Sequence, residues 1–464
     1  MTIADIKDQR VTVIGAARSG LAAARLLAEH GAAVFVTERG EIGGDARAAL
    51  DAANVAFEAG GHSERALDAD VFVVSPGVPD KAEIVQKVIE RGIPLYSEIE
   101  VASWFCGSPI VAITGSNGKT TTTSLVAHVF RTANRPLVLA GNIGSAFADH
   151  VAECGEGTTA VLEVSSFQLD HIDTFRPTVA ILLNVTPDHL DRYDHDFSTY
   201  AQSKFRLFEN QRSGDVLVYN HDDALVREHA ERDAAPGVVR YPFSVERELD
   251  RGAFVRDGSI VLRLTPPGSA GDSNPSPMEE VLMPTHNLAL RGRHNLYNSL
   301  AAAISARAIE ISSDVVRESL ASFEGVPHRL ELVREVSGVR YVNDSKATNV
   351  NAVWYALESF DAPIVLIAGG RDKGNDYSPI MDLVKARCRG IIGLGESGDK
   401  VLRELGDFAK AAARAHSMEE AIQFARLMAE PGDVVLMSPA CASFDMYANY
   451  EARGDEFKRL VHNL

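Results

Sequence analysis

The stretch Ile110-Val-Ala-Ile-Thr-Gly-Ser-Asn-Gly-Lys-Thr-Thr-Thr-Thr123 decides how this chain is interpreted. Its apolar half, Ile110 to Ile113, predicts a buried strand, and the residues from Thr120 to Arg131 predict a helix. A tight glycine and asparagine turn joins the two and ends at Lys119. In this order backbone N–H groups converge on phosphate oxygens, the lysine reaches the β- and γ-phosphates, and Thr120 or Thr121 can bind Mg²⁺. The stretch therefore predicts a loop that binds a nucleoside triphosphate.

This loop is shorter than the common phosphate loop, G-x-x-x-x-G-K-[ST]. The common pattern needs a glycine at position 113, where this chain has Ile113, and Gly115 is the nearest one. The alternative interpretation is a glycine turn that only connects a strand to a helix.

Length and charge limit the classes of protein that need to be considered. At roughly 150 residues per domain, a chain of 464 residues is expected to form about three domains. The net charge of −18 argues against general affinity for nucleic acid or for an anionic membrane, because an acidic surface repels both. We therefore expect neither as a partner.

The cysteines and the apolar segments indicate a cytoplasmic protein. The four cysteines form no C-x-x-C pair, which fits a reducing compartment. The first residues, Met1 to Asp8, lack the apolar region of a signal peptide, and the longest apolar runs have the length of strands.

The first domain has the pattern of a Rossmann-like fold. Strands are expected at Arg10 to Ile14 and Ala33 to Thr37, joined by a helix that Gly15-Ala-Ala-Arg-Ser-Gly20 opens. Ala17 replaces the middle glycine of the dinucleotide fingerprint, so a different nucleotide at the same helix start is favoured. A later strand, Val71 to Val74, runs into Ser75-Pro-Gly-Val-Pro79, which is either a ligand-binding loop or a plain turn.

Two acidic segments at strand ends indicate metal chemistry in the central domain. Glu163 ends the strand expected at Thr159 to Val164 and would suit Mg²⁺, unless it is only a solvated acid. Asp188, His189 and Asp191 follow another buried strand and indicate a metal or proton-transfer site, or else a polar surface loop.

Three further segments of this domain carry weaker signals. Lys204 lies on a helix expected at Phe197 to Gln211, and from spacing alone its side chain is expected to be solvated. Asn295, just before a helix expected at Leu296 to Ile309, either caps that helix or contacts a nucleotide base. The polar stretch Pro266 to Pro277 is expected to be a flexible insertion.

The last domain gathers polar residues at the ends of successive strands. Arg329, near the expected boundary, is a candidate clamp for nucleotide phosphate. Lysines and hydroxyls at neighbouring strand ends would line one crevice and suit a small substrate with carboxylates. These residues are Lys346 and Thr348, Lys373, and Ser443. The alternative for each is a surface loop residue.

Taken together, these motifs resemble those of the Mur ligases, ATP-dependent enzymes that add amino acids to the peptidoglycan precursor. The short phosphate loop is that family's form. The resemblance implies an α/β fold of three domains: a Rossmann-like substrate domain (1–106), a central, mostly parallel ATP-binding domain (107–326) and a Rossmann-like amino-acid domain (327–464). The segments that carry it are Thr114-Gly-Ser-Asn-Gly-Lys-Thr-Thr121, Gly141-Asn-Ile-Gly144, Glu163-Val-Ser-Ser-Phe-Gln168, Asn184-Val-Thr-Pro-Asp-His-Leu-Asp-Arg192, Gly292-Arg-His-Asn295 and Pro327-His-Arg329.

Within this family, Asp344-Ser-Lys-Ala-Thr-Asn349 and Ser438-Pro-Ala-Cys-Ala-Ser-Phe-Asp445 are similar to the D-glutamate-adding members. The resemblance therefore implies ATP, UDP-N-acetylmuramoyl-L-alanine and D-glutamate as substrates, two Mg²⁺ ions, and a monomeric enzyme. A Mur-type ligase for another amino acid, a phosphate-loop switch and a nucleotide-dependent oxidoreductase are the alternatives.

The resemblance also implies a role for each matching residue. Lys119, His189 and Lys204 would be catalytic, and Lys204 matches the lysine that family members carbamylate. ATP would contact Gly115, Ser116, Asn117, Gly118, Lys119, Thr120, Thr121, Asn295 and Arg329. Metal would be held by Thr120, Glu163, His189 and Lys204. The UDP-substrate would contact Ser19, Thr37, Gly77 and Asn142. D-Glutamate would contact Lys346, Thr348, Lys373, Ser443, Phe444 and Tyr450. The chain departs from the family pattern at Tyr450, where a phenylalanine is expected, and at Arg371-Asp372.

Overall fold

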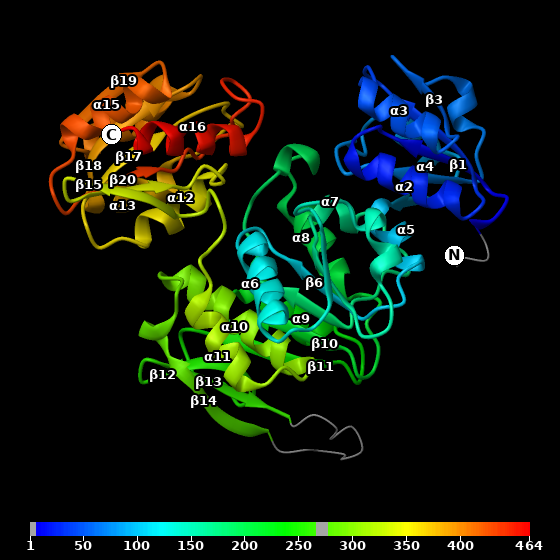
Figure 1. The fold of residues 1–464 in the computed structure, drawn as a ribbon, viewed down its shortest axis with the longest axis horizontal. Coiled ribbons are helices and arrows are strands. Elements are labelled where there is room, and N and C mark those ends of the chain that lie inside the picture. Colours follow the sequence, from blue (N-terminus) through cyan, green and yellow to red (C-terminus); the bar gives the residue numbers. More distant parts are fainter. Residues whose placement is uncertain (1–5, 266–276) are drawn as a thin grey trace. The chain divides into compact units, whose positions relative to one another are not determined.

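The computed structural model describes residues 6–265 and 277–464. Apart from Pro277, the insertion expected at Pro266 to Pro277 lies outside this part of the chain, as do the first five residues. The chain forms two compact units. One unit extends to Leu288 and resumes at Tyr297–Phe323, and the other comprises Ala289–Leu296 and Glu324–Leu464. The elements of both units are coloured along the sequence in Figure 1.

The first unit begins with a parallel sheet in the order β3-β2-β1-β4-β5. The order reverses direction beside β1, which creates the switch point where such sheets bind ligands. The strands are β1 (Arg10–Ile14), β2 (Ala33–Glu38), β3 (Ala56–Ala59), β4 (Val71–Val74) and β5 (Leu95–Ser97), and the helices are α2 (Arg18–Glu29), α3 (Gly44–Ala52), α4 (Glu83–Glu90) and α5 (Glu98–Trp104).

The same unit contains a larger sheet in the order β14-β13-β12-β11-β10-β9-β6-β8-β7. It is parallel from β7 to β12, and only β13 and β14 run antiparallel. The strands are β6 (Ile110–Thr114), β7 (Leu137–Gly141), β8 (Thr159–Glu163), β9 (Val179–Leu182), β10 (Val216–Asn220), β11 (Val239–Ser244), β12 (Gly252–Arg256), β13 (Ser259–Leu264) and β14 (Met278–Pro284). The helices are α6 (Lys119–Thr132), α7 (Ser166–Leu169), α8 (Phe197–Phe205), α9 (Ala224–Asp233), α10 (Arg293–Ala308) and α11 (Ser313–Ser322).

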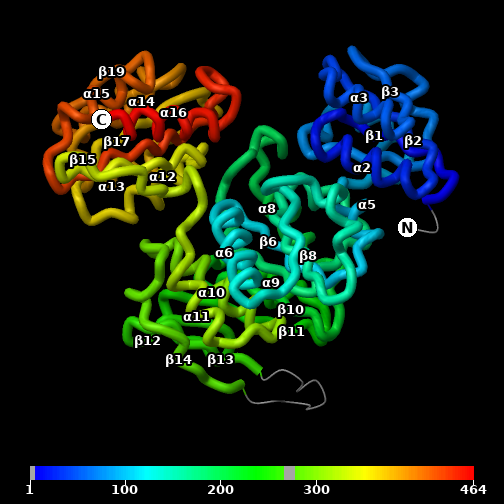
Figure 2. Tube along the Cα trace, in the orientation of Figure 1, coloured from blue at the N-terminus to red at the C-terminus, as the bar shows by residue number. Residues whose placement is uncertain are grey.

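The second unit is built on a sheet in the order β15-β16-β20-β17-β18-β19, parallel except for the β15–β16 hairpin. Figure 2 traces the chain through it from yellow to red. The fold class predicted from the sequence is confirmed. The strands are β15 (Glu331–Val336), β16 (Val339–Asn343), β17 (Ile364–Ala368), β18 (Cys388–Leu394), β19 (Ala411–Ala415) and β20 (Val434–Met437). The helices are α12 (Val350–Glu358), α13 (Met381–Arg387), α14 (Gly398–Leu405), α15 (Met418–Met428) and α16 (Tyr450–His462).

Two predicted helix boundaries were wrong. Helix α8 ends at Phe205 and not at Gln211, because Arg206–Phe208 tighten into a 3-10 turn that buries both Leu207 and Phe208. Helix α10 begins at Arg293 and not at Leu296, directly after Gly292, whose φ of +93° turns the chain into the helix.

No helix in the described part of the chain is long and apolar enough to cross a membrane. Several carboxyl groups are buried in the otherwise apolar interior, and one of them lies where α5 meets the 3-10 turn Phe147–Asp149. Glu98, at the start of α5, is 1% exposed, and its Oε1 accepts the backbone N–H of Ala148 at 2.6 Å. Its Oε2 is buried without a hydrogen-bond partner. Burial raises the pKa of Glu98 to about 7, and the nearby Asp149 carboxylate acts in the same direction.

We expect Glu98 to make unfolding depend on pH in a way that Glu98→Gln removes. Between its ordinary value of 4.5 and about 7, the folded state holds a proton that the unfolded state has lost. The free energy of unfolding therefore falls as pH rises through this window, by about 3 kcal/mol for a single group. The glutamine variant keeps the acceptor for Ala148 and should lose this decline. Urea unfolding at pH 5 and pH 8, followed by Trp104 fluorescence in a Trp354→Phe background, measures it; equal declines in both proteins would contradict the prediction.

Candidate active site

The phosphate loop lies at the carboxyl end of β6, between the neighbouring strands β8 and β9. Gly115 and Gly118 have φ values of +157° and +86°. A Cβ on Gly118 would stand 2.5 Å from Asn298 Oδ1, and one on Gly115 would stand 3.0 Å from Leu183 Cβ. Both positions therefore require glycine. The loop delivers the start of α6, where the first backbone N–H groups lack intrahelical partners and favour an anion.

Two asparagines that the sequence did not single out hold the loop in shape. Asn184 Oδ1 accepts the backbone N–H of Asn117 at 2.8 Å, and its Nδ2 donates to the Asn117 carbonyl at 3.0 Å. Asn298 Oδ1 accepts the hydroxyl of Thr122 at 3.2 Å. Asn184 stands in a recognisable motif, but nothing in the sequence links Asn298 to a loop that is distant along the chain.

The amino groups of Lys119 and Lys204 converge on one backbone carbonyl. Each Nζ donates to the carbonyl of Gly115 at 2.9 Å, and Lys119 also donates to the Ser116 carbonyl at 3.1 Å. Lys204 is 2% exposed, so the solvated side chain expected from spacing alone was wrong. Helix α8 directs this lysine to the carboxyl end of β6. There its Nζ lies 4.8 Å from the centre of the Tyr200 ring.

Burial and neighbouring charges shift the pKa of the Lys204 ammonium group. Burial lowers the pKa of the Lys204 ammonium well below its ordinary value, and the positive charge of Lys119 lowers it further. The carboxylates of Asp188, Asp170 and Glu163 act in the opposite direction. Charged side chains of α6, β8 and the loops after α7 and β9 thus act on this one buried amino group of α8.

Glu163 offers an oxygen that nothing in the protein occupies. It ends β8, is 2% exposed, and accepts a hydrogen bond from Asn142 Nδ2 on Oε1 at 2.8 Å. Its Oε2 is buried without a partner. Thr120 is also buried, at the start of α6. A carboxylate and a hydroxyl suit Mg²⁺, which takes oxygen ligands and keeps several of its waters and substrate phosphates.

His189 lies on the loop that follows β9. Its backbone is left-handed, with a φ of +50°, and its N–H donates to Asp188 Oδ1 at 2.9 Å. The ring stands edge-on to Phe167, with ring centres 6.0 Å apart. Among the described residues, no three His, Cys, Asp or Glu side chains form a ready-made metal cage. A cation here would therefore need hydroxyl or substrate oxygens as well.

Arg192, at the end of this loop, connects it to the first sheet. Its guanidinium donates to the carbonyls of Pro76 and Val78, at 2.6 and 2.9 Å, and lies 4.7 Å from the centre of the Phe167 ring. It thus holds the turn that contains Gly77, the loop residue expected to contact the UDP-substrate. Sequence reasoning gave Arg192 no role, although it ends a quoted motif.

Of the remaining residues expected at the UDP-substrate, Thr37 is fully buried and already bonded. Its hydroxyl donates to Glu58 Oε1 at 2.7 Å and lies 2.8 Å from His62 Nδ1. Ser19 lies in the first turn of α2, close to the β1 switch point. Asn142 belongs with Glu163 beside the phosphate loop and lies on a different sheet from Ser19 and Thr37.

We expect Arg192→Ala to raise the KM for the ligand of the first sheet, which is the expected UDP-substrate. Losing two hydrogen bonds to the Pro76–Val78 turn should cost roughly tenfold in KM, with a smaller effect on the KM for ATP. Arg192→Lys keeps the charge but loses the paired N–H donors of the guanidinium. Its KM should lie between those of Arg192→Ala and the wild type. Steady-state kinetics with each substrate varied in turn measures this. Lys81→Ala, which removes one exposed contact to the Asp191 carbonyl, is the matched control; equal KM increases for both ligands would contradict the prediction.

Asn295 and Arg329 belong to the second unit. Of the two roles considered for Asn295, helix capping does not hold, since α10 begins two residues earlier and Asn295 Nδ2 donates to the Arg291 carbonyl at 2.8 Å. The positive charge of Arg329 acts on both His294 and Asp344. Burial lowers the pKa of His294 to about 4 and raises the pKa of Asp344 to about 6.

The residues expected at D-glutamate fall into distinct groups. Lys346 Nζ lies 5.2 Å from the centre of the Tyr450 ring, and the backbone N–H of Thr348 donates to the Lys346 carbonyl at 3.0 Å. Lys373 is exposed after β17, and Ser443 is 2% exposed after β20. Phe444 is 64% exposed and lines a cavity of about 460 Å³ that also includes Arg371 and Arg414. Beside Lys373, Asp372 pairs with Lys400 at 2.8 Å, a partner that the sequence pattern did not indicate.

Three family models match this chain. The model described as "MurD N-terminal domain" matches residues 10–84, "Mur ligase middle domain" matches residues 113–306, and "Mur ligase, glutamate ligase domain" matches residues 328–441. Together they contain most of the segments that carry the site described above.

Full-length relatives are similar throughout. UDP-N-acetylmuramoylalanine--D-glutamate ligase of Salinibacter ruber is 60% identical, with 100% of each chain covered. The protein of the same name from Chloroherpeton thalassium is 44% identical, also with 100% of each chain covered. Among solved structures, UDP-N-acetylmuramate-alanine ligase MurC of Thermotoga maritima has a TM-score of 0.57 at 18% identity, covering 98% of this chain and 99% of its own. At that identity the structural likeness shows the fold alone.

Proposed function

This chain belongs to the Mur ligase family, and from that premise we propose its reaction in detail. It is an ATP-dependent amide ligase of peptidoglycan precursor synthesis. It adds D-glutamate to UDP-N-acetylmuramoyl-L-alanine, through an acyl phosphate. The observation that carries this conclusion is the full-length similarity to D-glutamate ligases, which extends from the first sheet to the last.

The first step activates a carboxylate, since an amine cannot displace oxide or hydroxide from it. An oxygen of the L-alanyl carboxylate attacks the γ-phosphorus of ATP, the bond to the β-phosphate oxygen breaks, and ADP leaves. We assign Lys119 to the β- and γ-phosphates, where its positive charge offsets the negative charge that moves during transfer. Its Nζ donates to the Gly115 and Ser116 carbonyls of the loop, which supports a role for this side chain at the loop.

The second step forms the amide bond. The neutral amine of D-glutamate attacks the acyl carbon, a tetrahedral intermediate forms, the nitrogen loses a proton, and inorganic phosphate leaves as the amide forms. We assign Lys346, Thr348, Lys373, Ser443, Phe444 and Tyr450 to D-glutamate. The cationic Lys346 beside the Tyr450 ring supports an anionic ligand there, because an ammonium group pairs with a carboxylate. Ser19, Thr37, Gly77 and Asn142 are assigned to the UDP-substrate, and Asn295 and Arg329 to ATP.

The oxygen donors beside the phosphate loop fit Mg²⁺. The unpartnered Oε2 of Glu163 and the buried Thr120 hydroxyl would hold it, with His189 and Lys204 serving a second ion. Bound Mg²⁺ would offset phosphate charge. We propose that Lys204 acts as a carbamate, because burial favours its neutral amine, the form that adds CO₂ with loss of a proton. We further propose a cytoplasmic monomer.

Release of ADP with different acceptors tests the proposal. The purified protein is incubated with ATP, Mg²⁺ and UDP-N-acetylmuramoyl-L-alanine, and with D-glutamate, L-alanine, L-lysine or meso-diaminopimelate. We expect ADP only when D-glutamate and the UDP-substrate are both present. ADP release with another acceptor would reassign the amino acid. Steady ADP release without any acceptor would favour a phosphate-loop switch, and a change in nicotinamide absorbance would favour an oxidoreductase.

A further inference from the structure

Two of the four cysteines lie side by side, although 48 positions separate them in the sequence. Cys106 lies in the connection between α5 and β6, and Cys154 follows the 3-10 turn Val151–Glu153. Cys106 packs against the apolar cluster that contains Cys154, and each thiol donates to a nearby backbone carbonyl, Cys106 Sγ to Ser108 at 3.5 Å and Cys154 Sγ to His150 at 3.7 Å. Both are free cysteines. Neither takes part in the reaction proposed above.

Backbone contacts fix the two segments against each other. The hydroxyl of Ser108 donates to the Gly155 carbonyl at 3.1 Å, and the N–H of Ala160 donates to the Pro109 carbonyl at 2.9 Å. A Cβ on Gly107 would stand 3.7 Å from the Cys154 carbonyl oxygen. These contacts hold the backbone segments that carry the two cysteines side by side. A disulfide, with an S–S bond of about 2 Å, needs just such closely spaced chain segments.

The two thiols differ in a way that suits sequential chemistry. The neighbouring Cys154 thiol lowers the pKa of the Cys106 thiol, because an S–H group nearby can stabilise the thiolate. The same interaction and burial raise the pKa of Cys154. Cys106 is partly exposed, whereas Cys154 is 8% exposed. Reactive cysteines are those with a low pKa and access to solvent, and a neighbouring second thiol can resolve the product.

We propose that Cys106 and Cys154 form a reversible redox-active dithiol, with Cys106 the residue that a peroxide modifies. The Cys106 thiolate attacks one peroxide oxygen, the O–O bond breaks, and with one proton the second oxygen leaves as water or an alcohol. Cys106 is then a sulfenic acid. The sulfur of Cys154 attacks it, its proton goes to the leaving hydroxyl, and water departs as the disulfide forms. The peroxide is reduced by two electrons, and the two thiols are oxidised by two.

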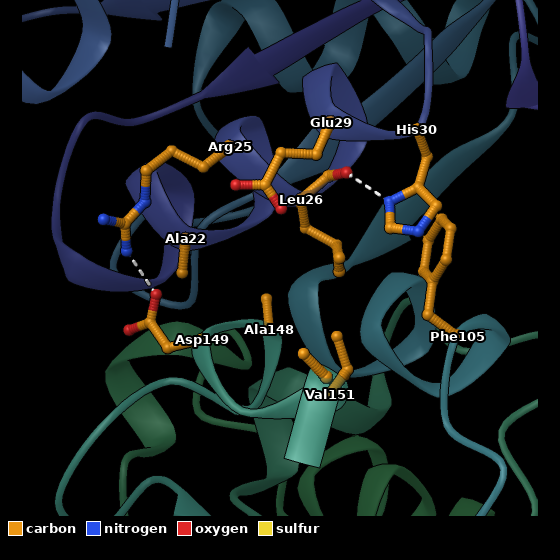
Figure 3. Close-up of a pocket in the computed structure, with 10 residues that line it drawn as sticks. Ala22, Arg25, Leu26, Glu29, His30, Phe105, Ala148, Asp149 and Val151 are labelled. Carbon is orange, nitrogen blue, oxygen red and sulfur yellow. Dashed lines mark hydrogen bonds and ion pairs between the residues drawn. The ribbon is translucent and has the colours of Figure 1, made fainter. Parts of the chain in front are cut away.

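The surroundings indicate what the disulfide would restrain. A cavity of about 380 Å³ lies beside the pair, between α2 and the 3-10 turns, and Figure 3 shows Phe105 and Val151 on its wall. Phe105 directly precedes Cys106. Across the cavity, Arg25 of α2 pairs with Asp149 (Figure 3). The disulfide would tie the connection between α5 and β6 covalently to the segment that follows the 3-10 turn Val151–Glu153.

Peptide mapping of the intact protein tests the proposal without relying on a variant. The reduced enzyme is treated with hydrogen peroxide, alkylated, and digested with trypsin without reduction. We expect the peptide 92–119 linked to the peptide 132–192, at a mass two hydrogens below their sum. Dithiothreitol should separate them. The folded protein is treated with peroxide and then unfolded in denaturant, and its thiols are titrated. We expect two titratable thiols in place of four, and four again after reduction.

Matched variants identify the roles of the two cysteines. Cys154→Ala should leave Cys106 with a several-fold slower alkylation by iodoacetamide at pH 7, and it should accumulate sulfenic acid that a dimedone probe traps. Cys106→Ser should form no disulfide, and Cys388→Ser should behave as the wild type. Circular dichroism checks that each variant is folded. Absence of the linked peptide from the peroxide-treated wild type, or disulfides between separate molecules on a non-reducing gel, would overturn the proposal.

Discussion

Lys119→Ala is expected to abolish ADP release, with kcat reduced at least about a thousandfold, which corresponds to roughly 4 kcal/mol of lost transition-state stabilisation. The reason is local. Lys119 starts α6 at the end of the phosphate loop, and its Nζ is already held over the Gly115 and Ser116 carbonyls. The measurement is coupled-assay kinetics with all three substrates.

A binding measurement separates loss of chemistry from loss of fold. Titration calorimetry of the Lys119→Ala protein with UDP-N-acetylmuramoyl-L-alanine should give a Kd close to that of the wild type. Lys81→Ala, at an exposed lysine of the same unit, is the control and should retain nearly full turnover. Turnover retained by Lys119→Ala would remove the phosphate-loop assignment altogether.

The second large effect is expected from Glu163→Gln. The amide keeps the shape and can keep the hydrogen bond with Asn142, but it replaces the charged carboxylate whose Oε2 is buried without a partner. We expect kcat to fall about a hundredfold or more and the concentration of Mg²⁺ needed for half-maximal activity to rise. Titrating activity against Mg²⁺ at saturating substrates measures both.

Glu153→Gln is the matched control for this variant, because Glu153 is an exposed acid of the same unit and lies outside the site. It should leave the Mg²⁺ requirement unchanged. If Glu163→Gln shows the Mg²⁺ requirement of the wild type, the oxygen left unpartnered in the structure is not a metal ligand and the metal assignment must move elsewhere.

Much of the fold was determined by local pattern. The apolar runs at Arg10–Ile14 and Val71–Val74 became strands with the predicted bounds, because strand periodicity and burial are written in consecutive residues. The boundaries of α8 and α10 were predicted wrongly, because a 3-10 turn ends α8 and a left-handed glycine precedes α10 without a change in the pattern of polar and apolar residues. The boundaries proposed between domains, at 106/107 and 326/327, stay a prediction.

The site divides along the same line. Sequence alone determined the phosphate loop, since its glycines, Lys119 and its threonines are adjacent along the chain and act through backbone that they shape themselves. It also identified the family. Only the tertiary structure decided the environment of each group. It buries Lys204 beside Lys119, leaves one oxygen of Glu163 unpartnered, and places Asn298 against Gly118 and Cys106 against Cys154. Burial and charge depend on segments far apart in sequence, and no local pattern encodes which of them meet.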